Sequence, residues 1–141
     1  MPTQTETGFA PCEITGMLRV EGLALLAASV TAFYLIGGNW WVFAGLILAP
    51  DLAMLGFLVG REIGSRLYNL AHTTTVPALL GGIAWFAGHA WLLSIAVIWL
   101  AHIGIDRALG YGLKYPGADR ATHLGWIGKA KSGKTSLANA S

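Results

Sequence analysis

At 141 residues, the chain is 55% hydrophobic and only 11% charged, with a formal net charge of +2. A soluble domain normally carries about a quarter charged residues, so this composition favours a membrane protein over a soluble one. So small a positive charge gives no reason to expect nucleic acid as a partner, and the single cysteine, Cys12, excludes an internal disulfide.

Four apolar segments long enough to cross a bilayer follow one another along the chain. They cover about residues 17–36, 40–60, 67–87 and 91–111, and short turns rich in glycine or charged residues separate them. We therefore predict an all-α membrane protein, with a four-helix transmembrane domain over residues 17–111. The polar residues 1–16 are expected to be flexible, and residues 112–141 are expected to form a basic, glycine-rich cytoplasmic tail.

The positions of the basic residues predict the orientation in the membrane. An even number of spans places both termini and the charged turn at 61–66 on one side, where all nine Lys and Arg fall. Cytoplasmic loops collect positive charge, so both termini are expected in the cytoplasm. The tryptophans at the opposite boundary resemble an interfacial aromatic belt: Trp40, Trp41, Trp85 and Trp91.

The predicted partners follow from this placement. The lipid bilayer is the first, because the four segments are predominantly apolar and long enough to cross it. Four short spans enclose little volume. We therefore also expect the chain to associate with copies of itself or to be a subunit of a larger membrane complex.

The end of the fourth segment, from Trp99 to Pro116, carries the most informative polar residues. His102 and Asp106 are four residues apart, so they project from the same side of one helix. Ionisable groups inside hydrocarbon are costly and usually face protein or water. These two side chains therefore require partners.

Polar residues of the other segments lie at a matching depth. A rise of about 1.5 Å per residue puts Asp51 about 15 Å and His72 roughly 10 Å from the cytoplasmic ends of their segments, in the same leaflet as His102. Asn69 shares a helix face with His72, and Glu21 enters the first segment from the same side. We therefore predict that all four helices contribute a polar group to one cytoplasm-facing cavity.

Two prolines lie next to these polar residues. Pro50 removes the amide that would bond the Leu46 carbonyl, and Pro77 does the same to the carbonyl of Thr73. The freed carbonyls are candidates to bind ions or waters. The alternative is that each proline only kinks its helix.

Two histidines and two aspartates suit a divalent transition metal such as zinc. His72, His102 and Asp106 are the candidate ligands, and Asp51 is a candidate fourth ligand or general base. Such a set leaves a position for water. A membrane hydrolase acting on a lipid-like or small substrate is therefore one predicted function.

The same residues support two other functions. Imidazoles and carboxylates at graded depths also suit a proton or ion conduit. Alternatively, the polar group only holds helices together in a non-catalytic accessory subunit of a larger complex. His123, beyond the fourth segment, is either a further ligand at the cytoplasmic mouth or a surface histidine.

Residues 128–135, GKAKSGKT, match the phosphate-binding pattern GxxxxGK[ST]. That motif functions between a strand and a helix of a parallel-sheet domain, whereas a glycine-rich linker precedes it here and only Ser136 to Ser141 follow. We therefore expect a solvated basic tail near anionic lipid and no bound nucleotide.

Four short motifs carry a family resemblance. They are Ala49–Phe57, Leu67–His72, Leu100–Pro116 and Thr122–Gly125. On these motifs, from about Leu18 to Gly128, the chain resembles an uncharacterised bacterial membrane family, domain of unknown function 4260. The resemblance implies a small multi-span protein of the bacterial inner membrane and supplies no activity. The family pattern has an acidic residue before the Thr-His pair and a basic one after Gly125, where this chain has Ala121 and Trp126.

Overall fold

The computed structural model describes residues 12–114, 121–122 and 125–126, which are mainly helical. The helices are α1 (Cys12–Leu35), α2 (Trp40–Leu46), the 3-10 helix η1 (Ala49–Leu58), α3 (Arg61–His72), α4 (Thr75–Phe86) and α5 (Ala90–Leu109). Two short strands, β1 (Ala121–Thr122) and β2 (Gly125–Trp126), pair antiparallel with Ala121 opposite Trp126. The predicted helical class is confirmed.

Three helical segments are long and apolar enough to cross a membrane. They are Glu13–Leu35, Trp40–Leu58 and Ala90–Leu109, and α4 is apolar but shorter. The first helix begins at Cys12, inside the stretch that we expected to be a flexible terminus. The chain therefore has membrane-length helices, while the count of four spans stays a prediction.

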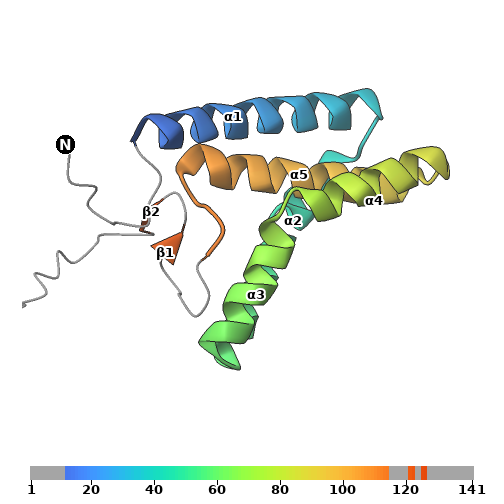
Figure 1. The fold of residues 1–141 in the computed structure, drawn as a ribbon. Coiled ribbons are helices and arrows are strands. Elements are labelled where there is room, and N and C mark those ends of the chain that lie inside the picture. The colour runs from blue at the N-terminus through green and yellow to red at the C-terminus, as the bar shows by residue number, and fades with distance from the viewer. Residues whose placement is uncertain (1–11, 115–120, 123–124, 127–141) are drawn as a thin grey trace, which may run out of the picture.

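The third predicted span, 67–87, is not a single helix. The helix α3 ends at His72, Thr73 has extended backbone, and α4 begins at Thr75. Figure 1 shows α3 leaving the other long helices at a steep angle. The break has a physical cause, because Pro77 lies in the first turn of α4, where a missing amide costs no helical hydrogen bond.

The second predicted span, 40–60, divides at a turn into α2 and η1, although the two together remain one apolar segment of membrane length. Two residues separate α2 from η1, and Pro50 is the second residue of η1. Both prolines therefore begin helices, which corrects the expectation that they loosen or kink helix interiors. The consequence is that the chain changes direction next to Asp51 and next to His72.

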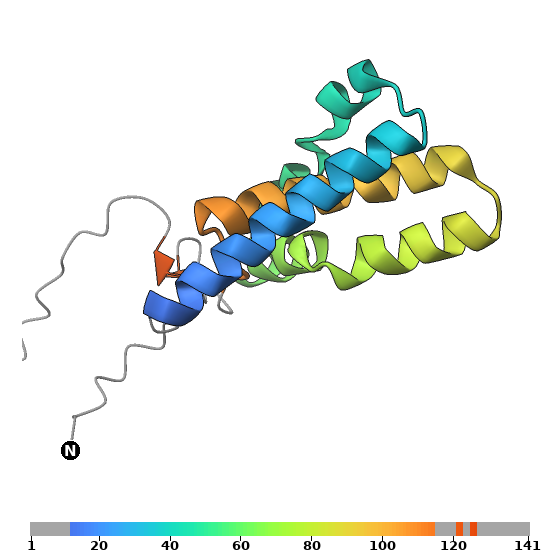
Figure 2. The same cartoon turned by 90° about the horizontal axis from the view of Figure 1, so that it is seen from above.

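The helix α5 is the centre of the fold. It contacts α1 and α4 along its length and also touches α2 and η1, and Figures 1 and 2 show α1, α4 and α5 running alongside one another. Phe33, near the end of α1, packs on Val97 and Ile98 in the middle of α5 and forms the apolar core with them. The helix ends at Gly110, whose positive φ of 91° is one that glycine adopts without strain.

The contact between α1 and α5 depends on two glycines. A Cβ atom on Gly104 would lie 2.7 Å from the backbone nitrogen of Leu26, and one on Gly22 would lie 2.6 Å from the backbone nitrogen of Ala108. Both distances are shorter than a carbon side chain tolerates. The two helix backbones therefore approach each other as closely as only glycine permits.

Candidate metal centre

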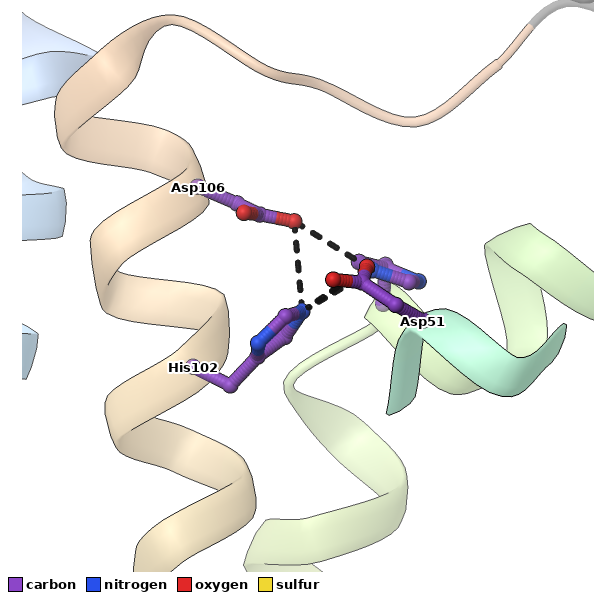
Figure 3. A group of neighbouring side chains, drawn as sticks. Asp51, His102 and Asp106 are labelled. Atoms are coloured by element: carbon purple, nitrogen blue, oxygen red, sulfur yellow. Dashed lines mark hydrogen bonds and ion pairs between the residues drawn. The ribbon is translucent and has the colours of Figure 1, made fainter. Parts of the chain in front are cut away.

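Four ionisable side chains from three elements meet at one point. Asp51 comes from the first turn of η1, His72 is the last residue of α3, and His102 and Asp106 come from α5. One donor atom from each lies within 4.8 Å of the others. Figure 3 shows His102 and Asp106 projecting from the same side of α5 toward Asp51. Asp51, His72, His102 and Asp106 are called the His–Asp cluster below.

The distances from the two imidazole nitrogens to each other and to the carboxylate oxygens are close to those between ligand atoms of a tetrahedral metal site. His72 Nε2 lies 3.2 Å from Asp106 Oδ2 and 3.4 Å from Asp51 Oδ1. His102 Nε2 lies 3.5 Å and 3.4 Å from the same two oxygens, and the two Nε2 atoms are 3.2 Å apart. Zinc bonds of about 2.0–2.2 Å at tetrahedral angles put neighbouring donor atoms about 3.3–3.6 Å apart. The residues present therefore fit a small divalent cation.

The hydrogen bonds of the histidines orient their lone pairs toward this point. The Nδ1–H of His72 donates to the Tyr68 carbonyl over 2.9 Å, which leaves Nε2 of the neutral ring as an acceptor. The backbone of Ile47 hydrogen-bonds the His102 ring. Acceptor atoms therefore face two carboxylates at short range, and such an arrangement requires a cation or extra protons between them.

Tyr68 supports His72 from the side. The two rings stack with centroids 3.8 Å apart. Tyr68 belongs to α3, outside the three membrane-length segments, and burial together with the nearby Asp106 carboxylate raises the pKa of its phenol above the usual range. A neutral aromatic ring therefore covers one face of the imidazole.

The members of the His–Asp cluster differ in exposure. The side chains of His72 and His102 are 2% and 4% exposed, that of Asp106 is 15% exposed, and that of Asp51 is 42% exposed. Three groups thus anchor the site from inside the protein. The fourth, Asp51, lies at its open side.

Two side chains of α5 hold the end of α3 in place. Trp99 Nε1 donates to the Ala71 carbonyl, and Arg107 Nη2 donates to the His72 carbonyl over 3.2 Å. These carbonyls belong to the last turn of α3, where no helical amide follows to bond them. Sequence reasoning missed Trp99, Arg107 and Tyr68. Only Tyr68 left a signal, since it lies four residues before His72 on the same helix face.

Asn69 is near the His–Asp cluster but not part of it. Its side chain accepts from the Lys114 amide over 2.6 Å and donates to the Lys114 carbonyl over 2.7 Å. The Lys114 ammonium in turn lies over the rings of Phe57 and Tyr68. Asn69 therefore fastens the segment after α5 to the hairpin of η1 and α3.

The other predicted site residues are not brought to this point. Glu21 is exposed on α1 and does not belong to the group. Three elements therefore supply the His–Asp cluster, rather than the four helices that we expected. His123 and the motif at 128–135 lie outside the described residues.

The fold and the site define a helical protein with membrane-length apolar segments and a group of two buried histidines and two partly exposed aspartates. A family model described as Domain of unknown function (DUF4260) matches residues 15–127, and the chain belongs to this family. This confirms the resemblance carried by the sequence motifs. No curated protein and no solved structure matches the chain.

Proposed function

We propose that this membrane protein binds one divalent transition-metal ion, such as zinc, in the His–Asp cluster and uses it for hydrolysis. The observation that carries the proposal is the set of distances among His72 Nε2, His102 Nε2 and Asp106 Oδ2, which are 3.2–3.5 Å. Those distances match tetrahedral zinc coordination. Mixed imidazole and carboxylate donors are typical of zinc and similar ions.

The gradient of exposure favours a catalytic site over a purely structural one. His72, His102 and Asp106 form a buried set of three ligands, which is the number that catalytic zinc sites use. A divalent ion held by these residues would lower the pKa of water and polarise a substrate oxygen. Asp51, at the open side, is placed to accept the proton from that water.

We place the protein in the bacterial inner membrane, with both termini cytoplasmic. In support, the guanidinium of Arg19 in α1 lies against Gly110 at the end of α5, and Arg107 lies in the last turn of α5. Basic residues of two helices therefore share one end of the fold. Trp40 is the first residue of α2, and Trp91 lies in the first turn of α5; both are at the other end of the fold. Association with further copies or a larger complex would cover part of the exposed apolar surface.

Metal analysis and hydrolysis assays test this function together. The wild-type protein, purified in detergent without chelators, is expected to contain about one divalent ion per chain. It is expected to hydrolyse a p-nitrophenyl ester or bis-p-nitrophenyl phosphate, with loss of activity after metal removal and recovery with zinc. Asp51→Asn should keep the metal and lose most activity, whereas His89→Ala, at an exposed histidine, should change neither. A metal-free wild type would overturn the proposal.

A proton conduit is the second candidate, and the contact between the two imidazoles favours it. His72 Nε2 and His102 Nε2 are 3.2 Å apart, close enough to share a proton. On this alternative, purified protein holds no metal, and proteoliposomes show a proton flux that Asp51→Asn abolishes. A metal-loaded protein in impermeable proteoliposomes contradicts it.

A further inference from the structure

An apolar cavity lies directly beside the His–Asp cluster. Its volume is about 360 Å³, within the range of small-molecule binding sites. The residues that line it are apolar, and they include Ala49, Pro50, Ala53, Ala71, Ile98 and Trp99. The indole N–H of Trp99 already donates to the Ala71 carbonyl, so it offers a ligand no free donor.

The cavity and the His–Asp cluster are continuous along one face of α5. Ile98 and Trp99 line the cavity, and His102 and Asp106 follow them at helical spacing. At about 1.5 Å per residue, the level of Ile98 is about 6 Å along the helix from that of His102. Asp106 lies one turn further toward the end of α5.

The other two walls repeat this arrangement. In η1, Pro50 lines the cavity and the next residue, Asp51, belongs to the His–Asp cluster. In α3, Ala71 lines the cavity and the next residue is His72. All three elements that supply metal-binding atoms therefore also supply cavity wall.

We propose that this cavity is an acyl-chain subsite, which holds one hydrocarbon chain of a bilayer lipid while the ester of that lipid reaches the His–Asp cluster. The inference rests on the proposed function and names its substrate class. At about 30 Å³ for a water-sized group, the cavity accommodates roughly a dozen methylene groups. That is the bulk of one chain and not of two.

A bilayer lipid is the occupant that the surroundings favour. Two of the cavity walls belong to membrane-length segments, Trp40–Leu58 and Ala90–Leu109. A soluble substrate would have to bury polar groups against a lining that offers almost no hydrogen bonds, which is costly. In a lipid, an apolar acyl chain leads to a polar ester. The chain matches the apolar cavity, and the ester then lies at the His–Asp cluster.

The reaction at such an ester is a hydrolysis that balances with water alone. The water oxygen adds to the carbonyl carbon, the bond from that carbon to the alcohol oxygen breaks, and the water proton passes through Asp51 to the leaving oxygen. The products are a carboxylic acid and an alcohol. No group is oxidised or reduced.

Photo-crosslinking with a defined lipid tests the subsite. The probe is a phosphatidylcholine with a diazirine in its acyl chain, in vesicles that contain the full-length protein, and labelled residues are mapped by mass spectrometry. Labelling at Ile98 and Trp99 is expected to exceed labelling at Phe86, which is 90% exposed on α4. Ala53→Trp, which fills the cavity, should reduce the labelling of Ile98 and Trp99 about tenfold and leave the metal content unchanged.

Two further variants make the result decisive. Ala49→Phe narrows the cavity from the start of η1, so a folding defect in one variant does not decide the outcome. Ala44→Trp is the matched control, because Ala44 is exposed on α2 and does not line the cavity. Two results with metal-loaded protein would overturn the acyl-chain subsite and leave the proposed function standing. One is labelling of Ile98 and Trp99 that is no higher than at Phe86, and the other is labelling that neither filling variant changes. Metal-free wild-type protein overturns the proposed function and the subsite with it.

Discussion

The two sides of α5 are built on opposite principles. Toward α1, Gly104 meets the backbone of Leu26 with no room for a side chain. Toward η1 and α3, His102 and Asp106 meet two ionisable partners, Asp51 and His72, at 3.2–3.4 Å. The first side is a close packing of backbones, and the second is a set of polar groups that satisfy one another only through a shared cation or proton. Close helix packing and the candidate metal centre therefore lie on opposite sides of one helix.

The largest expected effect is on metal affinity. His102→Ala removes one buried donor from the His–Asp cluster and should lower zinc affinity more than about a hundredfold, since even supporting residues typically contribute 10–100-fold. Competition with a chromogenic chelator measures the change. Its control is His89→Ala, at an exposed histidine before α5. Equal zinc affinity in the two variants would show that His102 is not a metal ligand.

The packing side of α5 should show the converse behaviour. Gly104→Ala forces a Cβ against the Leu26 backbone and should lower the free energy of unfolding by about 1–3 kcal/mol. The same substitution at Gly82 of α4 meets nothing within 4 Å and should be neutral or slightly stabilising. Unfolding by sodium dodecyl sulfate, followed by circular dichroism, compares them. If both variants unfold alike, the glycine contact is not what holds α1 to α5.

Arg107 tests the role of a residue that contacts the His–Asp cluster only through the backbone carbonyl of His72. Arg107→Gln removes the hydrogen bond to the His72 carbonyl and should weaken zinc binding about tenfold, as loss of a positioning group does. The control is Arg66→Gln, at an exposed arginine paired with Glu62. We expect Arg107→Lys to restore little, since an ammonium cannot reproduce the planar fork that also bonds the Tyr111 carbonyl. Full rescue by lysine would show that only the charge matters.

The smallest expected effect is at Asn69. Asn69→Ala removes both hydrogen bonds to the Lys114 backbone, which together contribute about 1–3 kcal/mol. Amide hydrogen exchange at Lys114 should become at least roughly fivefold faster, while zinc content stays the same. The control is Asn39→Ala, which removes the side-chain cap of α2 instead. Unchanged exchange at Lys114 would contradict the proposed fastening.

Sequence reasoning could predict the helical class of this protein and the four members of the His–Asp cluster for identifiable reasons. Low charge and long apolar runs indicate membrane-length helices, and the spacing of His102 and Asp106 places them on one helix face. Asp51 and His72 entered the prediction through their depth in the apolar segments. The structure brings these four side chains together, although the depth argument placed Glu21 with them and the structure does not.

What could not be predicted depends on where the backbone turns and on contacts between distant residues. The run from 67 to 87 is apolar enough to suggest one helix. In the structure, α3 ends just before Thr73, and α4 begins two residues before Pro77. Trp99 and Arg107 bond carbonyls 28 and 35 residues away, and no periodic pattern reports such contacts. The break follows from the position of Pro77 in the first turn of α4, whereas the two hydrogen bonds follow from tertiary packing against α5.

The most direct test of the central claim is X-ray absorption at the zinc edge on purified, zinc-loaded protein. We predict four nitrogen or oxygen neighbours at about 2.0 Å, with the outer-shell scattering of two imidazoles. His102→Ala should lose one imidazole contribution or the metal itself. A spectrum with sulfur ligands, or one that is identical in wild type and His102→Ala, would contradict a metal centre in the His–Asp cluster.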